Sequence, residues 1–500
     1  MSDAPAIAYA FAREHKLVAL GQEGASVRVA ITQDTGIEAI AEARRVLGKP
    51  LITERMDADQ FSRVLAEQYG AAGNGQNFGR YSAKSAEIAP QVLAKNDAAD
   101  DLLSARGDDG PAVQAVNQLL IAALNAQASD IHLEPYEKNC TARFRIDGQL
   151  RDVAAPLGDL TEHFAAIVAR LKVMARLDLA ERRLPQDGRI SVQIAGRAVD
   201  VRLSTLPCAF GERVVLRLLD QSSARLDLTS LGLPSDVHAT LKLLLNAPNG
   251  IVLVTGPTGS GKTTTLYAAL AEIAQRTRNI MTVEDPIEYA IPGIAQTAVN
   301  PGIGLTFARA LRAMLRQDPD VMLVGEIRDA ETAQIAVQAS LTGHLVLATL
   351  HTNDAAGAVT RLVEMGVEPY LLASTLRGVI AQRLVRTLCK ACKTEIETAP
   401  HVLARLRNIG DEGAVLTRTQ RAVGCAKCEG VGYRGRTGVY ECLVVDSAVR
   451  AEIQAGANHA ALTTAALKQG MRSVERDALR WLAKGETSID EVLRVGHSVE

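Results

Sequence analysis

The sequence predicts an α/β protein whose main domain is a mostly parallel β-sheet with helices on both faces. From about residue 230, short apolar runs typical of strands alternate with longer segments of helical spacing. A glycine-rich loop lies directly between the first of these strands and the first of these helices. Because 500 residues exceed what one hydrophobic core usually organises, we expect two to four domains.

The composition argues against a nucleic-acid or lipid surface as the main partner. The formal net charge is -2, and aromatic residues make up only 3% of the chain. Such a chain has no bulk electrostatic attraction to polyanions and few rings for stacking on bases. The start of the chain does not resemble a secretory signal, and the apolar stretches LLIAALNA and GIVLVTG are too short to span a bilayer. We therefore expect membrane association only through partners.

Residues 1–70 are predicted to form a small α/β domain. The runs VRVAI and PLIT are typical of strands, whereas AIAEARRVL and DADQFSRVLAEQY have helical spacing. Residues 71–110, which begin with AAGNGQNFGRYSAKS, have the composition of a linker.

Residues 111–229 are predicted to form a second domain of the α+β class. The segment AVQAVNQLLIAALNA is helix-like, and four alternating runs follow it: CTARFRIDG, GRISVQIAG, RAVDVRLST and ERVVLRLL. This pattern predicts a helix packed on an antiparallel sheet. Residues 230–500 are predicted to form the third domain, with the strand-like runs GIVLVTG, NIMTVED, VMLVGE and HLVLATLH.

The loop after the strand IVLVT fits the phosphate-loop pattern G-x-x-x-x-G-K-[ST]. Glycines let backbone N–H groups turn toward phosphate oxygens, and the following helix adds the positive end of its dipole. Lys262 supplies a cation, and Thr263 is expected to bind Mg²⁺ through its hydroxyl. The candidate ATP-binding residues are Gly256, Pro257, Thr258, Gly259, Ser260, Gly261, Lys262, Thr263 and Thr264.

Acidic residues and histidines follow neighbouring strands of the predicted sheet. Glu326 comes after VMLVG at the edge where ligands of open α/β sheets bind, so it is a candidate magnesium ligand, direct or through water. One acid of the group Glu284, Asp285 and Glu288 could orient or deprotonate the attacking water, and the residues alone do not choose among them. His344 and His351 flank LVLATL and could sense the γ-phosphate, although single histidines at strand ends are usually structural.

Four cysteines form two C-x-x-C pairs separated by 32 residues: Cys389, Cys392, Cys425 and Cys428. Four thiolates complete a tetrahedral zinc shell with no open position, so the predicted metal is structural. An iron–sulfur cluster or free thiols are the alternatives.

Arginines are frequent in the second domain, many of them on alternating strands, so one sheet face could present a row of guanidinium groups. They are Arg143, Arg145, Arg182, Arg183, Arg189, Arg197, Arg202, Arg213 and Arg217. Such groups can stabilise a transferring phosphoryl group, but solvated strand faces explain them equally well.

Four segments together resemble motifs of the secretion ATPase superfamily, in particular type II secretion ATPases of the GspE type. GPTGSGKTTTLYAAL is similar to the Walker A segment, TVEDPIEY to the Asp box, VMLVGEIRDAETA to Walker B and TGHLVLATLHTNDA to the His box. The resemblance covers nearly the whole chain. It implies a RecA-like P-loop ATPase domain, a preceding α+β (PAS-like) domain, a small N-terminal domain and a zinc-binding subdomain at about 386–440.

The resemblance also implies residue roles. Glu288 matches the Asp-box glutamate that activates water, Glu326 the Walker B glutamate, and His351 and His344 the His-box histidines. Arg189 and Arg202 are the nearest candidates for nucleotide-contacting arginines.

The implied function is that of a cytoplasmic, hexameric ATP hydrolase peripheral to the inner membrane, which uses ATP, Mg²⁺ and Zn²⁺. It would power pseudopilus assembly and protein export through type II secretion, with the inner-membrane protein GspL and the platform protein GspF as partners. Alternatives are a type IV pilus assembly ATPase, a nucleic-acid-translocating motor and a nucleotide-dependent scaffold.

Overall fold

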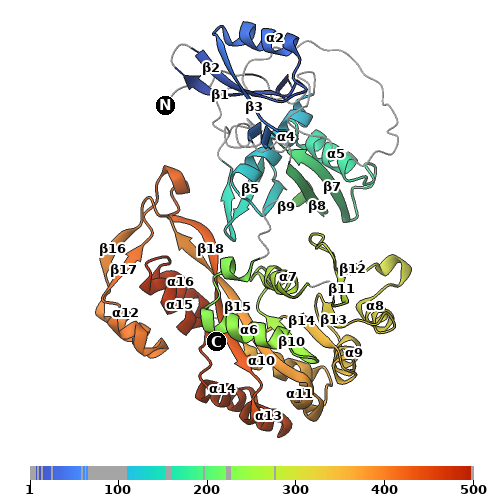
Figure 1. The fold of residues 1–500 in the computed structure, drawn as a ribbon, viewed down its shortest axis with the longest axis vertical. Coiled ribbons are helices and arrows are strands. Elements are labelled where there is room, and N and C mark those ends of the chain that lie inside the picture. Colours follow the sequence, from blue (N-terminus) through green and yellow to red (C-terminus); the bar gives the residue numbers. More distant parts are fainter. Residues whose placement is uncertain are drawn as a thin grey trace. The chain divides into compact units, whose positions relative to one another are not determined.

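A computed structural model describes residues 7, 11–12, 15–23, 26–57, 60–61, 64–65, 110–153, 160–194, 197–220, 227–274 and 277–496. The chain divides into two compact units, Met1–Ser223 and Ala224–Glu500 (Figure 1). The predicted linker at 71–110 lies outside the described residues except for Gly110. The finer division into domains at residues 70, 110 and 229 therefore stays a prediction.

The start of the first unit contains a three-stranded sheet of order β1-β2-β3 and one helix. Its elements are β1 (Leu17–Glu23), β2 (Ser26–Ile31), α2 (Ile37–Leu47) and β3 (Leu51–Arg55). β2 and β3 are parallel, as expected for two strands that a helix connects. α2 buries Ala39, Ala43 and Leu47, which recur every fourth residue and so share one face. The helical segment predicted at 57–69 lies largely outside the described residues.

The rest of the first unit is a six-stranded sheet of order β6-β5-β4-β9-β8-β7, with every neighbouring pair antiparallel. Its elements are α4 (Pro111–Asn125), β4 (Asp130–Pro135), β5 (Cys140–Ile146), β6 (Gln149–Asp152), α5 (Phe164–Met174), β7 (Gln186–Ile194), β8 (Arg197–Cys208) and β9 (Gly211–Asp220). Val199, Val201 and Leu203 alternate into one core with residues of α4 and α5. The antiparallel sheet agrees with the prediction, but β4, β6 and α5 were not foreseen.

The second unit is built on a seven-stranded sheet of order β12-β11-β13-β14-β10-β15-β18. The strands are β10 (Gly250–Thr255), β11 (Ile280–Glu284), β12 (Ala295–Ala298), β13 (Val321–Val324), β14 (Leu345–Leu350), β15 (Leu376–Leu388) and β18 (Tyr433–Val444). All neighbours pair in parallel except β18, which joins the edge antiparallel to β15. The prediction of a mainly parallel sheet is confirmed.

Helices cover both faces of this sheet, which explains why its central strands are apolar runs rather than alternating ones. Along β10, Ile251 and Leu253 belong to one buried cluster, whereas Val252 and Val254 belong to another. The second cluster includes residues of α6 (Ser235–Leu245) and α7 (Lys262–Ile273). The first includes residues of α8 (Phe307–Met314), α9 (Ala330–Leu341), α10 (Ala355–Glu364), α11 (Pro369–Thr375), α13 (Ser447–Gln454), α14 (His459–Lys468), α15 (Val474–Ala483) and α16 (Ile489–Gly496).

A smaller subdomain continues from the end of β15 and returns into β18. It contains the two-stranded antiparallel sheet of β16 (Thr394–Glu397) and β17 (Arg418–Arg421) and the helix α12 (Pro400–Ile409). Short 3₁₀ turns occur at Leu228–Leu231, Pro301–Ile303, Asp411–Val415 and Ala426–Cys428.

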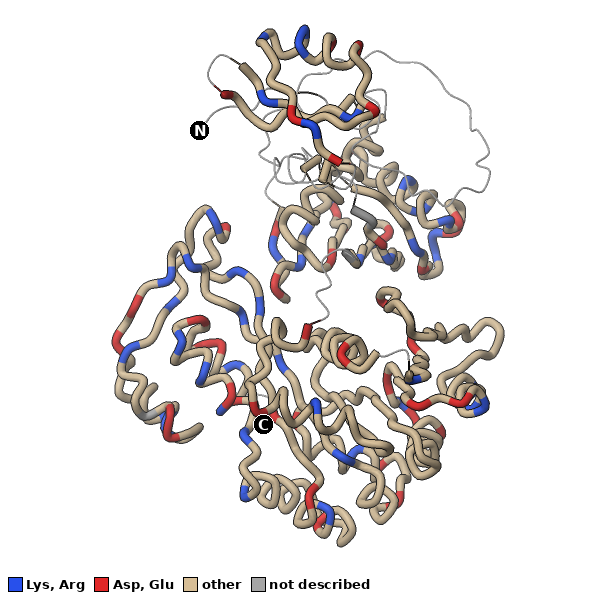
Figure 2. The backbone as a smooth tube through the Cα atoms, in the orientation of Figure 1, with Lys and Arg blue, Asp and Glu red and all other residues tan. Residues whose placement is uncertain are grey.

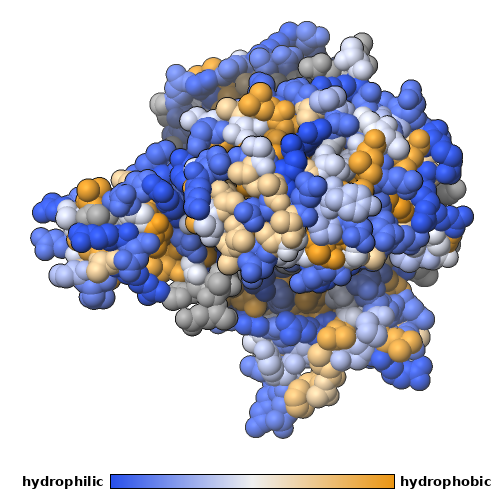
Figure 3. Space-filling model, turned by 90° about the horizontal axis from the view of Figure 1, so that it is seen from below, coloured by the Kyte–Doolittle hydropathy of each residue, from blue (hydrophilic) through white to orange (hydrophobic). Residues whose placement is uncertain are grey.

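Both signs of charge are mixed along the backbone of each unit (Figure 2). On the face shown in Figure 3, hydrophobic residues form groups interrupted by hydrophilic ones. Among the described residues, no helix has the length and apolar character needed to cross a membrane.

Candidate functional site

The phosphate loop lies between the end of β10 and the start of α7, and its glycines are required by a close approach to β15. Gly256 and Gly261 have φ angles of +146° and +88°, which L side chains rarely adopt. A Cβ at Gly256 would lie 2.3 Å from the backbone oxygen of Gln382, and one at Gly261 would lie 2.9 Å from its Nε2. The Gln382 side chain is itself fixed, because Thr265 of α7 donates a 2.7 Å hydrogen bond to its Oε1.

Lys262 begins α7, and its ammonium group lies inside the loop. Its Nζ donates to the backbone oxygens of Gly256 at 2.7 Å and Pro257 at 3.2 Å. Burial lowers the pKa of Lys262 to about 8, while the nearby Glu326 carboxylate favours the charged form. A partly desolvated cation of this kind gains stability from an anion that enters the loop. Thr263 and Thr264 are exposed on the first turn of the same helix.

His351 connects Lys262 to Glu326 through its two ring nitrogens. Nδ1 lies 3.5 Å from Lys262 Nζ, and Nε2 lies 3.3 Å from a carboxylate oxygen of Glu326. An ammonium can only donate, so Nδ1 accepts and the neutral ring carries its proton on Nε2, facing Glu326. Arg328 forms an ion pair with the other oxygen of Glu326. The segment after β14 is held by Thr352, whose hydroxyl lies 2.7 Å from that of Thr255.

The three Asp-box acids have different environments. Glu284 is 3% exposed and accepts hydrogen bonds from Tyr267, from Thr282 at 2.5 Å and from Gln296 at 3.1 Å. Through these hydrogen bonds, the Glu284 carboxylate connects α7, β11 and β12. Asp285 is exposed, and Glu288 is partly buried with its backbone amide 3.2 Å from the Tyr267 hydroxyl. The geometry therefore disfavours Glu284 as the residue that activates water.

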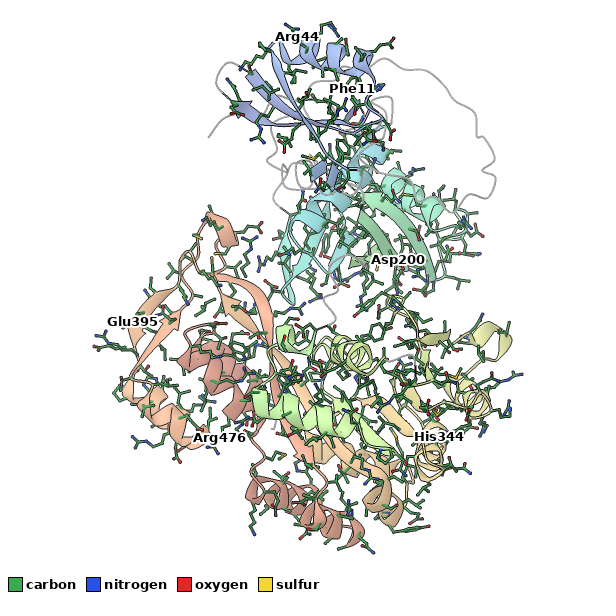
Figure 4. The ribbon with its side chains drawn as sticks, in the orientation of Figure 1. Phe11, Arg44, Asp200, His344, Glu395 and Arg476 are labelled. Carbon is green, nitrogen blue, oxygen red and sulfur yellow. The ribbon has the colours of Figure 1, made fainter. Side chains whose placement is uncertain are left out.

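The two predicted histidines lie at opposite ends of the strand β14. His344 precedes β14, where its backbone oxygen accepts from Gly250 at the start of β10, and His351 follows β14 beside the loop. The six residues of β14 span roughly 20 Å. His344 Nδ1 lies 2.9 Å from the backbone oxygen of Ala339, at the end of α9 (Figure 4). His344 is therefore not gathered with Lys262, Glu326 and His351 within this unit.

The four predicted cysteine ligands form one cluster, in which all the sulfurs lie within 4.8 Å of one another. Cys389 Sγ is 4.0 Å from Cys425 Sγ, and Cys392 Sγ is 3.7 Å from Cys428 Sγ. Four sulfurs at 2.3 Å from a tetrahedral zinc ion are about 3.8 Å apart, so the spacing fits zinc. Burial alone would raise the pKa of Cys428, but the amides of Cys425 and Gly432 donate to its sulfur and lower the pKa to about 6. The amides that face the Cys428 sulfur suit a metal-bound thiolate there, whereas burial raises the pKa of Cys392 to about 11.

The arginines of the six-stranded sheet are mostly paired with carboxylates of the same sheet. Arg189 binds Asp200 of the neighbouring strand, a residue labelled in Figure 4, and Arg202 lies between Arg189 and Arg217 in the strand register. The other pairs are Arg143 and Arg213 with Glu134, and Arg145 and Arg217 with Asp130. Arg189 and Arg202 keep their nucleotide-contacting role as a prediction.

Comparison with known proteins decides the family. The model of the Type II/IV secretion system protein family matches residues 105–494, and a model of the N-terminal domain of GSPII protein E matches residues 6–69. This chain belongs to the type II secretion ATPase family. The prediction of a secretion ATPase from its motifs is thereby confirmed.

Curated relatives of this secretion ATPase match it over nearly their full length. It is 49% identical to the type II secretion system protein HxcR of Pseudomonas aeruginosa, over 97% of this chain and 98% of that protein. It is 47% identical to the type II secretion system ATPase E of Vibrio cholerae, over 97% and 96% of the two chains. The type II secretion system protein E of Dickeya dadantii is 48% identical over 98% and 97%.

Solved structures give the same fold. The Legionella pneumophila ATPase DotB matches with a TM-score of 0.57 at 22% identity, over 80% of this chain and 99% of that one. The pilus retraction motor PilT, solved with bound ADP, matches with a TM-score of 0.51 at 26% identity, over 76% and 97%. The expected RecA-like α/β class of this secretion ATPase is confirmed.

Three residues of the site in this secretion ATPase were not predicted from its sequence. Gln382 supports the phosphate loop, Arg328 pairs with Glu326, and Tyr267 connects α7 to the Asp box. A polar residue inside the apolar run GVIAQRLV was a usable signal for Gln382. Arg328 stands two residues after Glu326, close enough to be considered with it.

Proposed function

We propose that this secretion ATPase hydrolyses MgATP at the carboxyl-terminal edge of its seven-stranded sheet and uses the energy to drive pseudopilus assembly and protein export. The main support is the chain of contacts from Lys262 through His351 to Glu326 beside the phosphate loop, in which each contact is 3.5 Å or shorter. This is the edge at which open α/β sheets bind their ligands.

In the proposed mechanism, each residue of the site has a separate role in phosphoryl transfer. The loop amides and Lys262 hold the β- and γ-phosphates, and Thr263 and Glu326 would hold Mg²⁺, which neutralises charge on the phosphate oxygens. Glu288 takes a proton from the attacking water while the oxygen of that water forms a bond to the γ-phosphorus. The bond from that phosphorus to the bridging oxygen breaks, and ADP leaves with phosphate as the second product. His351, whose Nε2 faces Glu326, would be placed to donate a proton on that atom toward the γ-phosphate.

Assembly and location are further parts of the proposal. We infer a homo-hexamer on the cytoplasmic side of the inner membrane, attached through the cytoplasmic domain of GspL and the platform protein GspF. The match of residues 6–69 to the N-terminal domain of GSPII protein E supports a docking role for this part of the chain. We also propose that Cys389, Cys392, Cys425 and Cys428 hold a structural zinc ion, because their sulfur spacing suits a closed tetrahedral shell.

The proposal is tested by the rate of phosphate release from ATP, with and without the purified cytoplasmic domain of GspL. We expect the rate to rise when the domain is added and to be unchanged by single-stranded DNA. Stimulation by DNA alone, with binding that weakens steeply with salt, would instead support a nucleic-acid motor. ATP binding without hydrolysis under every condition, membrane-bound partners included, would support a scaffold.

A further inference from the structure

The phenol group of Tyr267 lies between the helix of the phosphate loop and the Asp box. Tyr267 is on the second turn of α7 and is 0% exposed. Its hydroxyl donates to the carboxylate of Glu284 and accepts a hydrogen bond of 3.2 Å from the backbone amide of Glu288. Burial, together with the Glu284 carboxylate, raises the pKa of Tyr267, so the phenol remains a neutral donor. One buried oxygen therefore connects α7, the end of β11 and the segment that carries Glu288.

Neighbouring contacts hold the rest of the Asp box to the same point. The ring of Tyr289 packs edge-on against that of Tyr267, with centroids 4.6 Å apart. Gln296 of β12 donates to Glu284 at 3.1 Å and to the backbone oxygen of Tyr289 at 3.2 Å, and accepts from the Ile291 amide at 2.7 Å. The segment after β11 is thus fixed on both sides of Glu288 through one buried carboxylate.

We propose that Tyr267 is a positioning residue for ATP hydrolysis, whose hydroxyl fixes the backbone at Glu288 and so sets the distance of the Glu288 carboxylate from the phosphate loop. The inference rests on the proposed role of Glu288 as the group that activates water. Tyr267 follows Lys262 on the same helix, so the lysine and the Glu288 segment share one rigid support. A displacement of about 1 Å at a reacting group can reduce a rate by about a hundredfold.

The test compares two substitutions that each remove one phenol oxygen from the same pair of rings. Tyr267→Phe removes the connection to Glu284 and Glu288 but keeps the packed ring. Tyr289→Phe is the matched control, because the buried Tyr289 hydroxyl has no hydrogen-bond partner among the described residues. We expect kcat for ATP hydrolysis to fall about ten- to hundredfold in Tyr267→Phe, with KM and the Kd for nucleotide within about twofold of wild type. Tyr289→Phe should keep both constants within about twofold.

A combination with Glu288→Gln separates positioning from a general structural effect. If Tyr267 acts through Glu288, Tyr267→Phe should lower the activity of wild type but not that of the Glu288→Gln variant. An unchanged kcat in Tyr267→Phe, or an equal loss in the Glu288→Gln background, would overturn the inference. A weakened Kd for nucleotide with unchanged kcat would also overturn it. Full activity of Glu288→Gln alone would instead refute the proposed role of Glu288, which is a distinguishable failure.

Discussion

The proposed catalytic edge, where the parallel strands end beside the phosphate loop, and the tetracysteine cluster are both connected to β15, but they are held together differently. Near the middle of β15, Gln382 supports the phosphate loop, and directly after its end comes Cys389. The catalytic edge joins side chains that are up to 117 residues apart through hydrogen bonds around a buried apolar core. The cysteines come from two turns, and the nearby strands β16 and β17 expose most of their residues. The core can therefore hold the first region, whereas we expect the cysteine turns to depend on the proposed metal ion.

The largest effect that tests this difference is removal of the metal ligands. The double substitution Cys392→Ser and Cys428→Ser should reduce bound zinc from about one ion per chain to none. The apparent free energy of zinc binding in small zinc domains is about 10 kcal/mol, so loss of the ion should unfold this subdomain locally. Metal analysis and limited proteolysis between residues 386 and 440 would measure this. Cys208→Ser, at an exposed cysteine outside the cluster, is the control, and a double variant that kept its metal would contradict the assignment.

The next prediction is a loss of activity with no loss of stability. Lys262→Ala should lower kcat about a thousandfold, about 4 kcal/mol in the barrier, because the cation at the phosphates is lost. The thermal midpoint should not fall, because the substitution removes a buried cation whose pKa is already lowered to about 8. Phosphate release and thermal unfolding give the two values. Lys242→Ala, at a lysine side chain that is 61% exposed, should leave both unchanged. Normal hydrolysis by Lys262→Ala would refute the site.

The sequence predicted the strands and the loop of the catalytic edge but not the contacts that align them. Apolar runs such as GIVLVTG are local patterns, and they correctly indicated parallel strands with polar residues at their ends. The contact of Thr265 with Gln382 joins positions 117 residues apart and depends on which strand lies beside β10. His344 is a different case, because the sequence already placed it before the strand LVLATL and only its motif associated it with nucleotide sensing. For the cysteines the local spacing of the two C-x-x-C pairs was sufficient to predict that the four sulfurs form one cluster.

A smaller effect is a pH dependence of the free energy of unfolding, which we expect from Glu441 beside β15 but not from the cysteine subdomain. Glu441 of β18 lies opposite Ala381 of β15 and accepts a 2.8 Å hydrogen bond from the Ala355 amide at the start of α10. Burial, with Asp354 and Glu475 nearby, raises the pKa of Glu441 to about 7 from an ordinary value of 4.5. A raised folded-state pKa contributes stability that is complete below about pH 4.5 and is lost as the pH rises through about 7, at most about 3 kcal/mol.

Glu441→Gln keeps an acceptor for the amide and removes this titration. Its free energy of unfolding should therefore fall less between pH 5 and pH 8 than that of wild type, as chemical denaturation at each pH would show. Glu397→Gln, on the exposed strand β16 of the cysteine subdomain, should follow the wild-type profile. Parallel profiles for wild type and Glu441→Gln would exclude the titration of this carboxyl as a contribution.

The smallest effect distinguishes the two His-box histidines. His351 contacts both Lys262 and Glu326, so His351→Gln should lower kcat about tenfold, or about 1.4 kcal/mol, as the proton facing Glu326 loses its fixed direction. The loss is modest because Arg328 still holds Glu326 and the loop still holds Lys262. His344→Gln should keep kcat within about twofold, because β14 separates His344 from the loop by roughly 20 Å. A tenfold loss in His344→Gln, with His351→Gln unaffected, would reverse the assignment of the two edges and place nucleotide sensing where the strands begin.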